Sequence, residues 1–364
     1  MFKCHWCFSI NWGGIGIGYG IPHRKQKESK FIEKAIPFTG EYYQFNNNKI
    51  TGFSQNVVAN PSLLSSFNTL DLNNKDIDGN ASFSPRVFNE WKCLKISLAS
   101  TKFHFDSHGR SGYEAFADSS LSSVIELDLT GADFASSIST DLPSYTGYAY
   151  TASYTFIGAI FSSLTSLDLS GAVFAVGGMT TSGSVYTAHS TFNYAIFSSL
   201  TSLDLTGAVF VADEMATSGD IGTASSTFYC ASFTTLTSLD LSGAVFAVGE
   251  MTTSGNVNTA SSTFASTRFP SLTTLNLSGA VFAASGMTSG NVNTASNTFN
   301  SGTIVNLSSL CLPQDQSNQT WTNTFANCNY PAAGGTVHWS GYTGSNKPNG
   351  WTDEWFSSWT WTQS

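Results

Sequence analysis

The sequence predicts a β-rich repeat solenoid in which each coil carries one short parallel strand and short helical or 3-10 turns join the strands. Three observations lead to this prediction. One eleven-residue segment occurs in four near-identical copies, the copies are 36 residues apart, and only 11% of the 364 residues are charged. A chain of stacked repeats forms one continuous array, although its length alone would suggest two or three domains.

The repeated segment reads Leu-Thr-Ser-Leu-Asp-Leu-Ser-Gly-Ala-Val-Phe at residues 164–174, and its near-copies begin at residues 200, 236 and 272. Side chains alternate between the two faces of a strand, so the Leu-Asp-Leu core points both leucines inward and the acid outward. Further cores extend the array to eight rungs; they lie at residues 70–72, 96–98, 127–129 and 305–307.

The second half of each unit ends in a phenylalanine, and in five consecutive units the next Leu-Asp-Leu core begins 11 residues after it. Stacked coils place equivalent residues about 4.8 Å apart, so these phenylalanines and those that close the eleven-residue segment should form columns inside the solenoid. The aromatic content is therefore attributed to the core. Residues 259–262, just before one closing phenylalanine, have the Thr and Ser composition of a helix N-cap and predict at most one helical turn.

The two halves of the unit together resemble a known family. The frame Leu-x-x-Leu-x-Leu-x-x-Ala-x-Phe at 164–174 follows the leucine-rich repeat, and LDLS followed by the segment at 256–264 is similar to the repeat of BspA-like leucine-rich-repeat surface proteins. The unit is longer here, and Ala260 and Thr263 stand where that family has Met. Over about residues 60–330, the resemblance implies a leucine-rich-repeat-like solenoid. It also implies a cell-surface or secreted protein for adhesion to, or recognition of, a protein or glycan ligand, with no catalytic residues.

Three segments are expected along the chain. Residues 1–37 form an N-terminal leader, either poorly ordered or a cap; residues 38–330 form the solenoid, with its clearest repeats at 164–300; and residues 331–364 form a Trp-rich C-terminal cap. The leader lacks a convincing secretory signal, because glycines interrupt its apolar stretch and no clean cleavage site follows. No run approaches 18 apolar residues, so no membrane span is expected.

The charges are unevenly distributed along the chain. Thirteen of the 15 Lys and Arg residues lie at or before Arg110, whereas only Arg268 and Lys347 accompany the 16 carboxylates that follow it. An acidic surface of this kind repels a phosphate backbone, so nucleic-acid binding is not expected. An enzymatic function is not expected either, since the six His are scattered and no nucleophile elbow is present.

The outward acids of the repeat predict a ladder of side chains that would face a ligand: Asp128, Asp168, Asp204, Asp240 and Asn276. Carboxylates about 4.8 Å apart repel one another, so each needs a compensating contact. One hypothesis is bridging by Ca²⁺, which prefers several oxygen ligands. The alternative is hydrogen bonding to hydroxyls or backbone N–H groups of a neighbouring coil. No other cofactor is expected.

Two further groups of residues allow more than one interpretation. The tryptophans of the last segment could stack on sugar rings or could cover the apolar end of the last coil; they are Trp351, Trp355, Trp359 and Trp361. His104, Asp106 and His108 would lie on one face of a strand and form a candidate metal site. The Gly-Arg-Ser-Gly sequence after them favours a polar loop instead.

Two alternatives to adhesion stay open. The solenoid could serve as a structural or self-assembling coat protein. Regular columns of threonine also suggest an ice-binding solenoid, although they are not arranged as Thr-x-Thr on one strand. One column contains Thr165, Thr201, Thr237 and Thr273, and the other contains Thr187, Thr223, Thr259 and Thr294.

Overall fold

The structure, a computed structural model, describes residues 33–136, 147–175, 179–211, 214–248, 250–283, 287, 291–314, 320–321, 323–329, 331, 334–352 and 354–364. Most of the predicted leader, 1–37, lies outside these residues. The described residues form short parallel strands arranged as a repeat solenoid, which confirms the predicted fold class. Their helices are α1 (Gln55–Ala59), the 3-10 helix η1 (Pro61–Leu64) and α2 (Pro85–Glu90).

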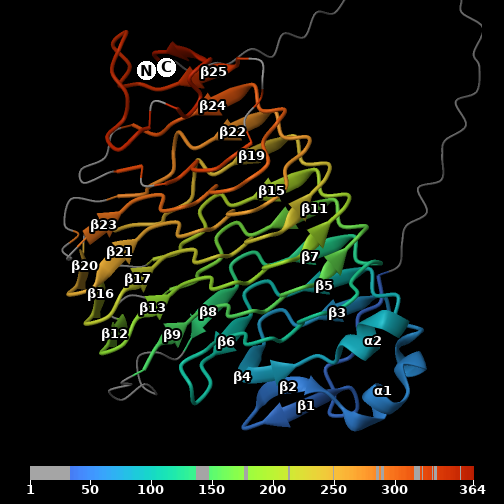
Figure 1. Cartoon of the computed structure of the whole chain (residues 1–364). Coiled ribbons are helices and arrows are strands. Elements are labelled where there is room, and N and C mark those ends of the chain that lie inside the picture. Colours follow the sequence, from blue (N-terminus) through green and yellow to red (C-terminus); the bar gives the residue numbers. More distant parts are fainter. Residues whose placement is uncertain are drawn as a thin grey trace, which may run out of the picture. The chain divides into compact units, whose positions relative to one another are not determined.

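A parallel sheet of ten strands runs through the repeats and contains the predicted Leu-Asp-Leu strands (Figure 1). Equivalent residues of neighbouring coils pair in register, so that Leu167 lies opposite Leu203 and Asp168 opposite Asp204. In sheet order, the strands are β26 (Thr360–Thr362), β25 (Thr336–His338), β24 (Ser309–Cys311), β22 (Thr274–Asn276), β19 (Ser238–Asp240), β15 (Ser202–Asp204), β11 (Ser166–Asp168), β7 (Glu126–Asp128), β5 (Lys95–Ser97) and β3 (Thr69–Asp71).

Most central coils also join further ladders, whereas the sequence predicted one strand per coil. Two three-stranded sheets are β10 (Ile160–Phe161), β14 (Ile196–Phe197), β18 (Ser232–Phe233), and β12 (Met179–Thr181), β16 (Glu214–Thr217), β20 (Glu250–Thr253). A five-stranded sheet contains β23 (Asn291–Asn293), β21 (Asn256–Asn258), β17 (Ile221–Gly222), β13 (Val185–Tyr186) and β9 (Ala149–Tyr150). Another contains β1 (Tyr43–Asn46), β2 (Lys49–Phe53), β4 (Asp76–Ser82), β6 (Lys102–His104) and β8 (Asp133–Ser136), with β1 antiparallel to β2. Successive coils are therefore hydrogen-bonded along several of their sides.

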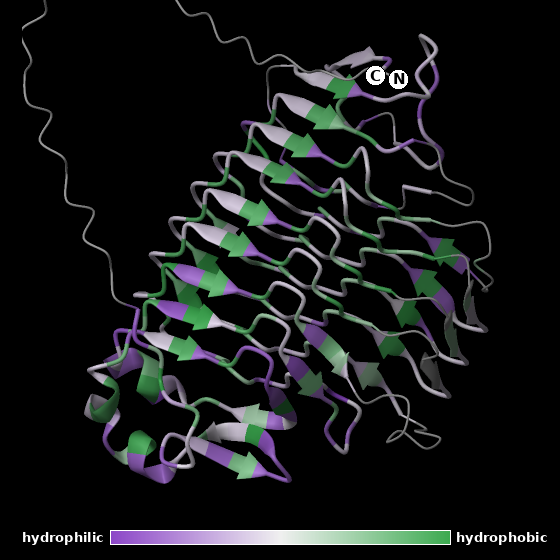
Figure 2. Cartoon of the chain, turned by 180° about the vertical axis from the view of Figure 1, so that it is seen from behind, coloured by the Kyte–Doolittle hydropathy of each residue, from purple (hydrophilic) through white to green (hydrophobic). Residues whose placement is uncertain are grey.

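Columns of phenylalanine fill the main core, as the repeat predicted. In the column that closes each unit, the rings of Phe192, Phe228 and Phe264 are stacked with neighbouring centroids 5.1 Å apart. Two more columns, which include Phe174 and Phe197, stack at 4.9 Å to the next ring. All five rings are buried. Figure 2 shows the corresponding hydropathy pattern, with a hydrophobic middle between more polar ends in the strands of the ten-stranded sheet.

A smaller apolar cluster joins two of the side ladders. It contains Met215 of β16 and Met251 of β20 together with Ile221 of β17 and Val257 of β21. The repeat pattern does not distinguish this cluster from the main core, because a single repeat gives no indication of how many layers it folds into. Burial of these apolar side chains stabilises the part of each central coil that forms the two side ladders.

Residues 259–262 form no helix and instead form a turn with left-handed residues. The φ angles of Ala260 and Ser262 are 47° and 55°. The Thr259 hydroxyl accepts the backbone N–H of Ala295 in the next coil at 3.1 Å, instead of capping a helix in its own coil. The helical turn predicted here is wrong, because a single turn fixes several residues for one hydrogen bond, whereas the stacked turn bonds to the coils on both sides.

The C-terminal segment continues the ten-stranded sheet. The predicted cap, 331–364, contributes β25 and β26, so the sheet has ten rungs where eight were predicted. The rung predicted at 305–307 is wrong, since the strand is β24, and Leu310 pairs with Leu275. Leu310 lies 11 residues after the closing Phe299, as in the earlier units.

The three helices lie at the N-terminal end of the array (Figure 1). Their buried residues include Val57, Leu64 and Phe88, which belong to the main core together with Phe53 and Trp91. Among the described residues, none of the helices has the length and hydrophobicity that a membrane crossing requires.

Candidate recognition surface

The outward side of the central strands of the ten-stranded sheet is a regular polar surface, which we call the ladder face. It consists of the first and third residues of β7, β11, β15, β19 and β22, whose middle leucines are buried. One column contains Glu126, Ser166, Ser202, Ser238 and Thr274, and the other contains Asp128, Asp168, Asp204, Asp240 and Asn276. The structure thus brings the five predicted ladder residues together in one column.

Each carboxylate of the column is held by its own coil. The backbone N–H two residues later donates to Oδ1 of Asp168, Asp204 and Asp240 at 2.8 Å. The expectation that a neighbouring coil supplies these partners is therefore wrong for Asp168 and Asp204, because the short turn after each strand places the nearest N–H within reach. Oδ2 of Asp168 and of Asp204 has no hydrogen bond to any described residue. These oxygens form a fixed row of outward acceptors.

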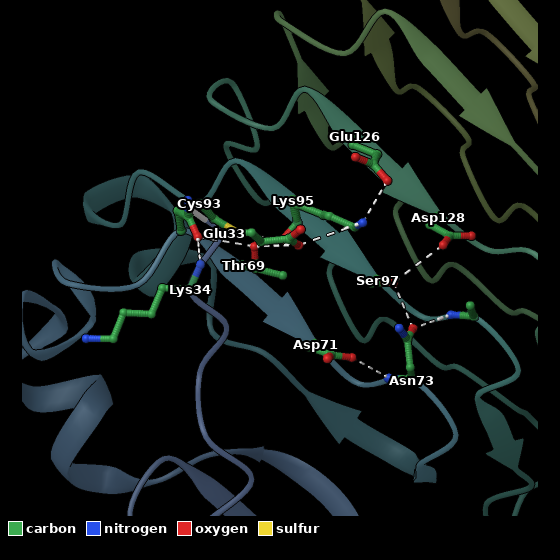
Figure 3. A network of polar contacts seen from close by, with 12 residues as sticks. Glu33, Lys34, Thr69, Asp71, Asn73, Cys93, Lys95, Ser97, Glu126 and Asp128 are labelled. Atoms are coloured by element: carbon green, nitrogen blue, oxygen red, sulfur yellow. Dashed lines mark hydrogen bonds and ion pairs between the residues drawn. The ribbon is translucent and has the colours of Figure 1, made fainter. Parts of the chain in front are cut away.

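Neutral donors from neighbouring coils form hydrogen bonds with the first and last carboxylates of the column, Asp128 and Asp240. The Ser97 hydroxyl lies 3.4 Å from Oδ2 of Asp128 and 2.8 Å from Oδ1 of Asn73 (Figure 3). At the other end, the side-chain amide of Asn276 donates to Oδ1 of Asp240 at 3.1 Å. The repulsion between stacked carboxylates is thus confined to a run of four residues, between Asp128 and Asp240.

Lys95 forms an ion pair with Glu126, the first residue of the other column of the ladder face. Lys95 Nζ lies 2.9 Å from Glu126 and 3.7 Å from Glu33 (Figure 3). The hydrogen bond with Glu126 raises the pKa of Lys95. From Ser166 to Asn276, both columns of the ladder face contain only hydroxyl, carboxylate and amide side chains.

Two of the three candidate metal residues lie near each other, with Asp106 Oδ2 3.8 Å from His108 Nδ1, whereas His104 contacts a different residue. Asp106 has a fully buried side chain, whose carboxylate accepts the backbone N–H groups of His108 and Arg110 and pairs with the Arg110 guanidinium, each at 2.8 Å. His104 Nε2 contacts Asp76 at 3.1 Å, and His108 is exposed. The bonds of Asp106 to Arg110 favour the polar-loop interpretation of this segment over a metal site at His104, Asp106 and His108. In the part of the chain that the structure describes, no group of three or more His, Cys, Asp or Glu side chains could hold a metal ion.

The C-terminal tryptophans are mainly packed against one another and against the last phenylalanine column. Trp355 and Trp359 are only 6% exposed, so for these two residues the structure favours coverage of the last coil over stacking on sugar rings. Phe325 packs against Trp351 and Trp355 with centroids 5.8 Å apart. Trp351 and Trp361 are half-buried, and Lys347 Nζ lies 3.4 Å from the centroid of the Trp361 ring. This packing covers the end of the Phe325 column.

The two threonine columns differ in exposure. Thr187, Thr223 and Thr259 are fully buried, and their hydroxyls accept backbone N–H groups of the next coil at 3.0–3.2 Å. This column cannot contact ice. The other column is exposed beside the ladder face, but the hydroxyls of Thr201 and Thr273 donate to carbonyl oxygens of the preceding coil.

A groove that the repeat pattern does not predict lies on the sheet formed by β10, β14 and β18. It has a volume of about 560 Å³ and is lined by Tyr194, Ile196, Cys230, Ser232, Ser266 and Arg268. Its one distinctive feature in the sequence is Arg268, the one Lys or Arg between Arg110 and Lys347. Its importance becomes clear only when the stacking brings the other five residues beside it.

Comparisons of the chain with protein-family models, with curated proteins and with solved structures found no match.

Proposed function

We propose that this protein is a non-enzymatic recognition module, displayed at a cell surface or secreted, that adheres to a protein or glycan ligand through its ladder face. The observation that carries the proposal is the in-register column Asp128–Asn276 beside an exposed column of hydroxyl groups. The resemblance of the repeat to BspA-like surface proteins supports the same class of function.

The chemistry of the ladder face suits multivalent attachment. It offers the same acceptor and hydroxyl groups on successive strands, about 4.8 Å apart, so an extended ligand can form many equivalent contacts. Because the backbone already fixes Asp168 and Asp204, little side-chain entropy is lost when a ligand binds. Catalysis would instead need one constellation of unlike groups.

The proposal is tested with arrays of glycans and extracellular-matrix proteins. The test variant is D168N/D204N/D240N, which removes three charges while keeping the turn hydrogen bond, since Asn276 Oδ1 accepts the same bond from the Ser278 N–H at 3.1 Å. The matched control is D220N, because Asp220 likewise accepts a backbone N–H, from Asn256 at 2.7 Å, but lies outside the ladder face.

We expect saturable binding by the wild type and by D220N, and loss of that binding in the triple variant. Binding that the triple variant retains would contradict the ladder face as the binding surface. Self-association in sedimentation, with no binding to any array component, would favour the coat-protein alternative.

A further inference from the structure

The groove at Arg268 lies between two outward columns of side chains from three successive coils. Tyr194, Cys230 and Ser266 form one column, and Ile196, Ser232 and Arg268 form the other. The residue between each pair points inward: Ala195, Ala231 and Thr267 are all fully buried. The chain turns at the first column, where Tyr194, Cys230 and Ser266 have left-handed φ angles of 57°, 55° and 55°, and the buried residue after each of them lies beneath the groove.

Arg268 gives the groove an uncompensated positive charge. Its side chain is exposed and forms no ion pair or hydrogen bond with any described residue. None of the six lining residues is acidic. By contrast, Lys347, the other cation after Arg110, lies against the Trp361 ring. A guanidinium presents a planar fork of donors that matches a carboxylate, so the groove favours an anionic group at this end.

The two serines of the groove have unused hydroxyls. Neither Ser232 nor Ser266 forms a side-chain hydrogen bond with another described residue. Neighbouring hydroxyls differ, since those of Thr234 and Ser271 donate to carbonyl oxygens of the preceding coil at 2.8 and 2.7 Å. The groove therefore offers free donors and acceptors in the coil of Arg268 and in the coil before it, and an entirely apolar ligand would leave them unsatisfied.

An aromatic ring and an aliphatic side chain line the opposite end of the groove. Tyr194 is 56% exposed and Ile196 is 41% exposed. The Tyr194 ring is supported edge-on by Tyr229, with centroids 6.1 Å apart at 87°. From this coil to that of Arg268 there are two steps of about 4.8 Å, a span that accommodates one or two sugar rings.

We propose that this groove binds a carboxylated sugar, with the sugar ring against Tyr194, its hydroxyls at Ser232 and Ser266, and its carboxylate at Arg268. This inference goes beyond the ladder face, because the groove belongs to a different sheet. It assigns a separate site to the chemical class that combines an apolar ring face, hydroxyl groups and one negative charge.

The test is isothermal titration of the full chain with 3′-sialyllactose and with a glucuronic-acid disaccharide, each beside a neutral counterpart. We expect saturable binding of at least one acidic sugar, and binding at least about tenfold weaker for its neutral counterpart, since a charge-assisted hydrogen bond contributes about that factor. The two acidic probes distinguish a sialic acid from a uronic acid as the source of the carboxylate.

The variants are R268Q, which removes the charge, R268K, which keeps it, and T303A, a control one coil beyond Arg268 in the same column. We expect R268Q to lose at least about tenfold in affinity, R268K to lose less, and T303A to match the wild type. The ladder variant D168N/D204N/D240N should bind the acidic sugar normally, which separates this inference from the proposed function.

Three results would overturn the inference. One is the absence of saturable binding of either acidic sugar at millimolar concentration. Another is equal binding by R268Q and the wild type when both melt at the same temperature. The third is binding of decanoate as tight as that of the sugars, which would assign the groove to an aliphatic carboxylate.

Discussion

Replacing Thr223 with valine should destabilise the protein through one lost hydrogen bond in the buried threonine column. The Thr223 side chain is fully buried, and its Oγ1 accepts the backbone N–H of Ala260 in the next coil at 3.0 Å. Valine has nearly the same shape, so the change removes the acceptor without opening a cavity. The Ala260 N–H is then buried without a partner, which costs about 1–3 kcal/mol.

The matched control is Thr237→Val, in the exposed threonine column. The Thr237 hydroxyl forms no hydrogen bond with any described residue, so we expect its loss to change the unfolding free energy by less than about 0.5 kcal/mol. The assay is urea unfolding followed by circular dichroism, with the midpoints compared at equal slope. Equal midpoints for the two variants would refute the role assigned to the buried column.

Four further predictions concern other parts of the molecule. Burial lowers the pKa of His189 to about 4, so the unfolded chain takes up a proton first as the pH falls below about 6.5. The free energy of unfolding should therefore decrease by about 3 kcal/mol between pH 6.5 and 4. In H189S, the free energy measured by urea unfolding should decrease less over the same pH range. Trp355→Ala should cost about 3–5 kcal/mol by urea unfolding, because the ring is buried against Phe325. Burial raises the pKa of Cys93 and of Cys328 to about 12, so both should react with a thiol reagent only after unfolding, as peptide mass mapping would reveal. The melting temperature should be the same in chelator and in millimolar Ca²⁺, since backbone N–H groups already hold the ladder carboxylates; a rise with Ca²⁺ would indicate cation bridging.

The regular part of the fold could be predicted because the residue pattern and the spacing of the repeat determine its strands and their stacking. The Leu167-Asp168-Leu169 alternation gives a strand with one buried face, and identical spacing gives in-register stacking. Residues 305–307 match the motif but do not form the strand, whereas the constant interval of 11 residues after Phe299 leads to Leu310. Spacing was thus a better guide than residue identity where the repeat degenerates.

The turns could not be predicted in the same way. Ala260 and Ser262 adopt left-handed φ angles, which alanine and serine rarely do, so their identities give no local signal. The stack imposes this conformation through hydrogen bonds between coils, such as that from the Ser262 N–H to Ser296 at 2.8 Å. The burial of Thr223 follows from the same turn.

The ladder face could be located from sequence, but the groove could not. Asp168, Asp204 and Asp240 share one position in the repeat, so a single strand prediction places all three. Tyr194 and Arg268 occupy different repeats and different positions within the unit, and only the three-dimensional stacking places them along one groove.

The most direct test of recognition through the ladder face is carboxyl labelling of the protein with and without the ligand that the arrays identify. Labelling with a carbodiimide and glycine ethyl ester is read out by peptide mass spectrometry. If the ladder face binds the ligand, Asp168, Asp204 and Asp240 should be protected in the complex, whereas labelling of Asp220 should be unchanged. Unchanged labelling of the three ladder residues in a saturated complex would contradict this account.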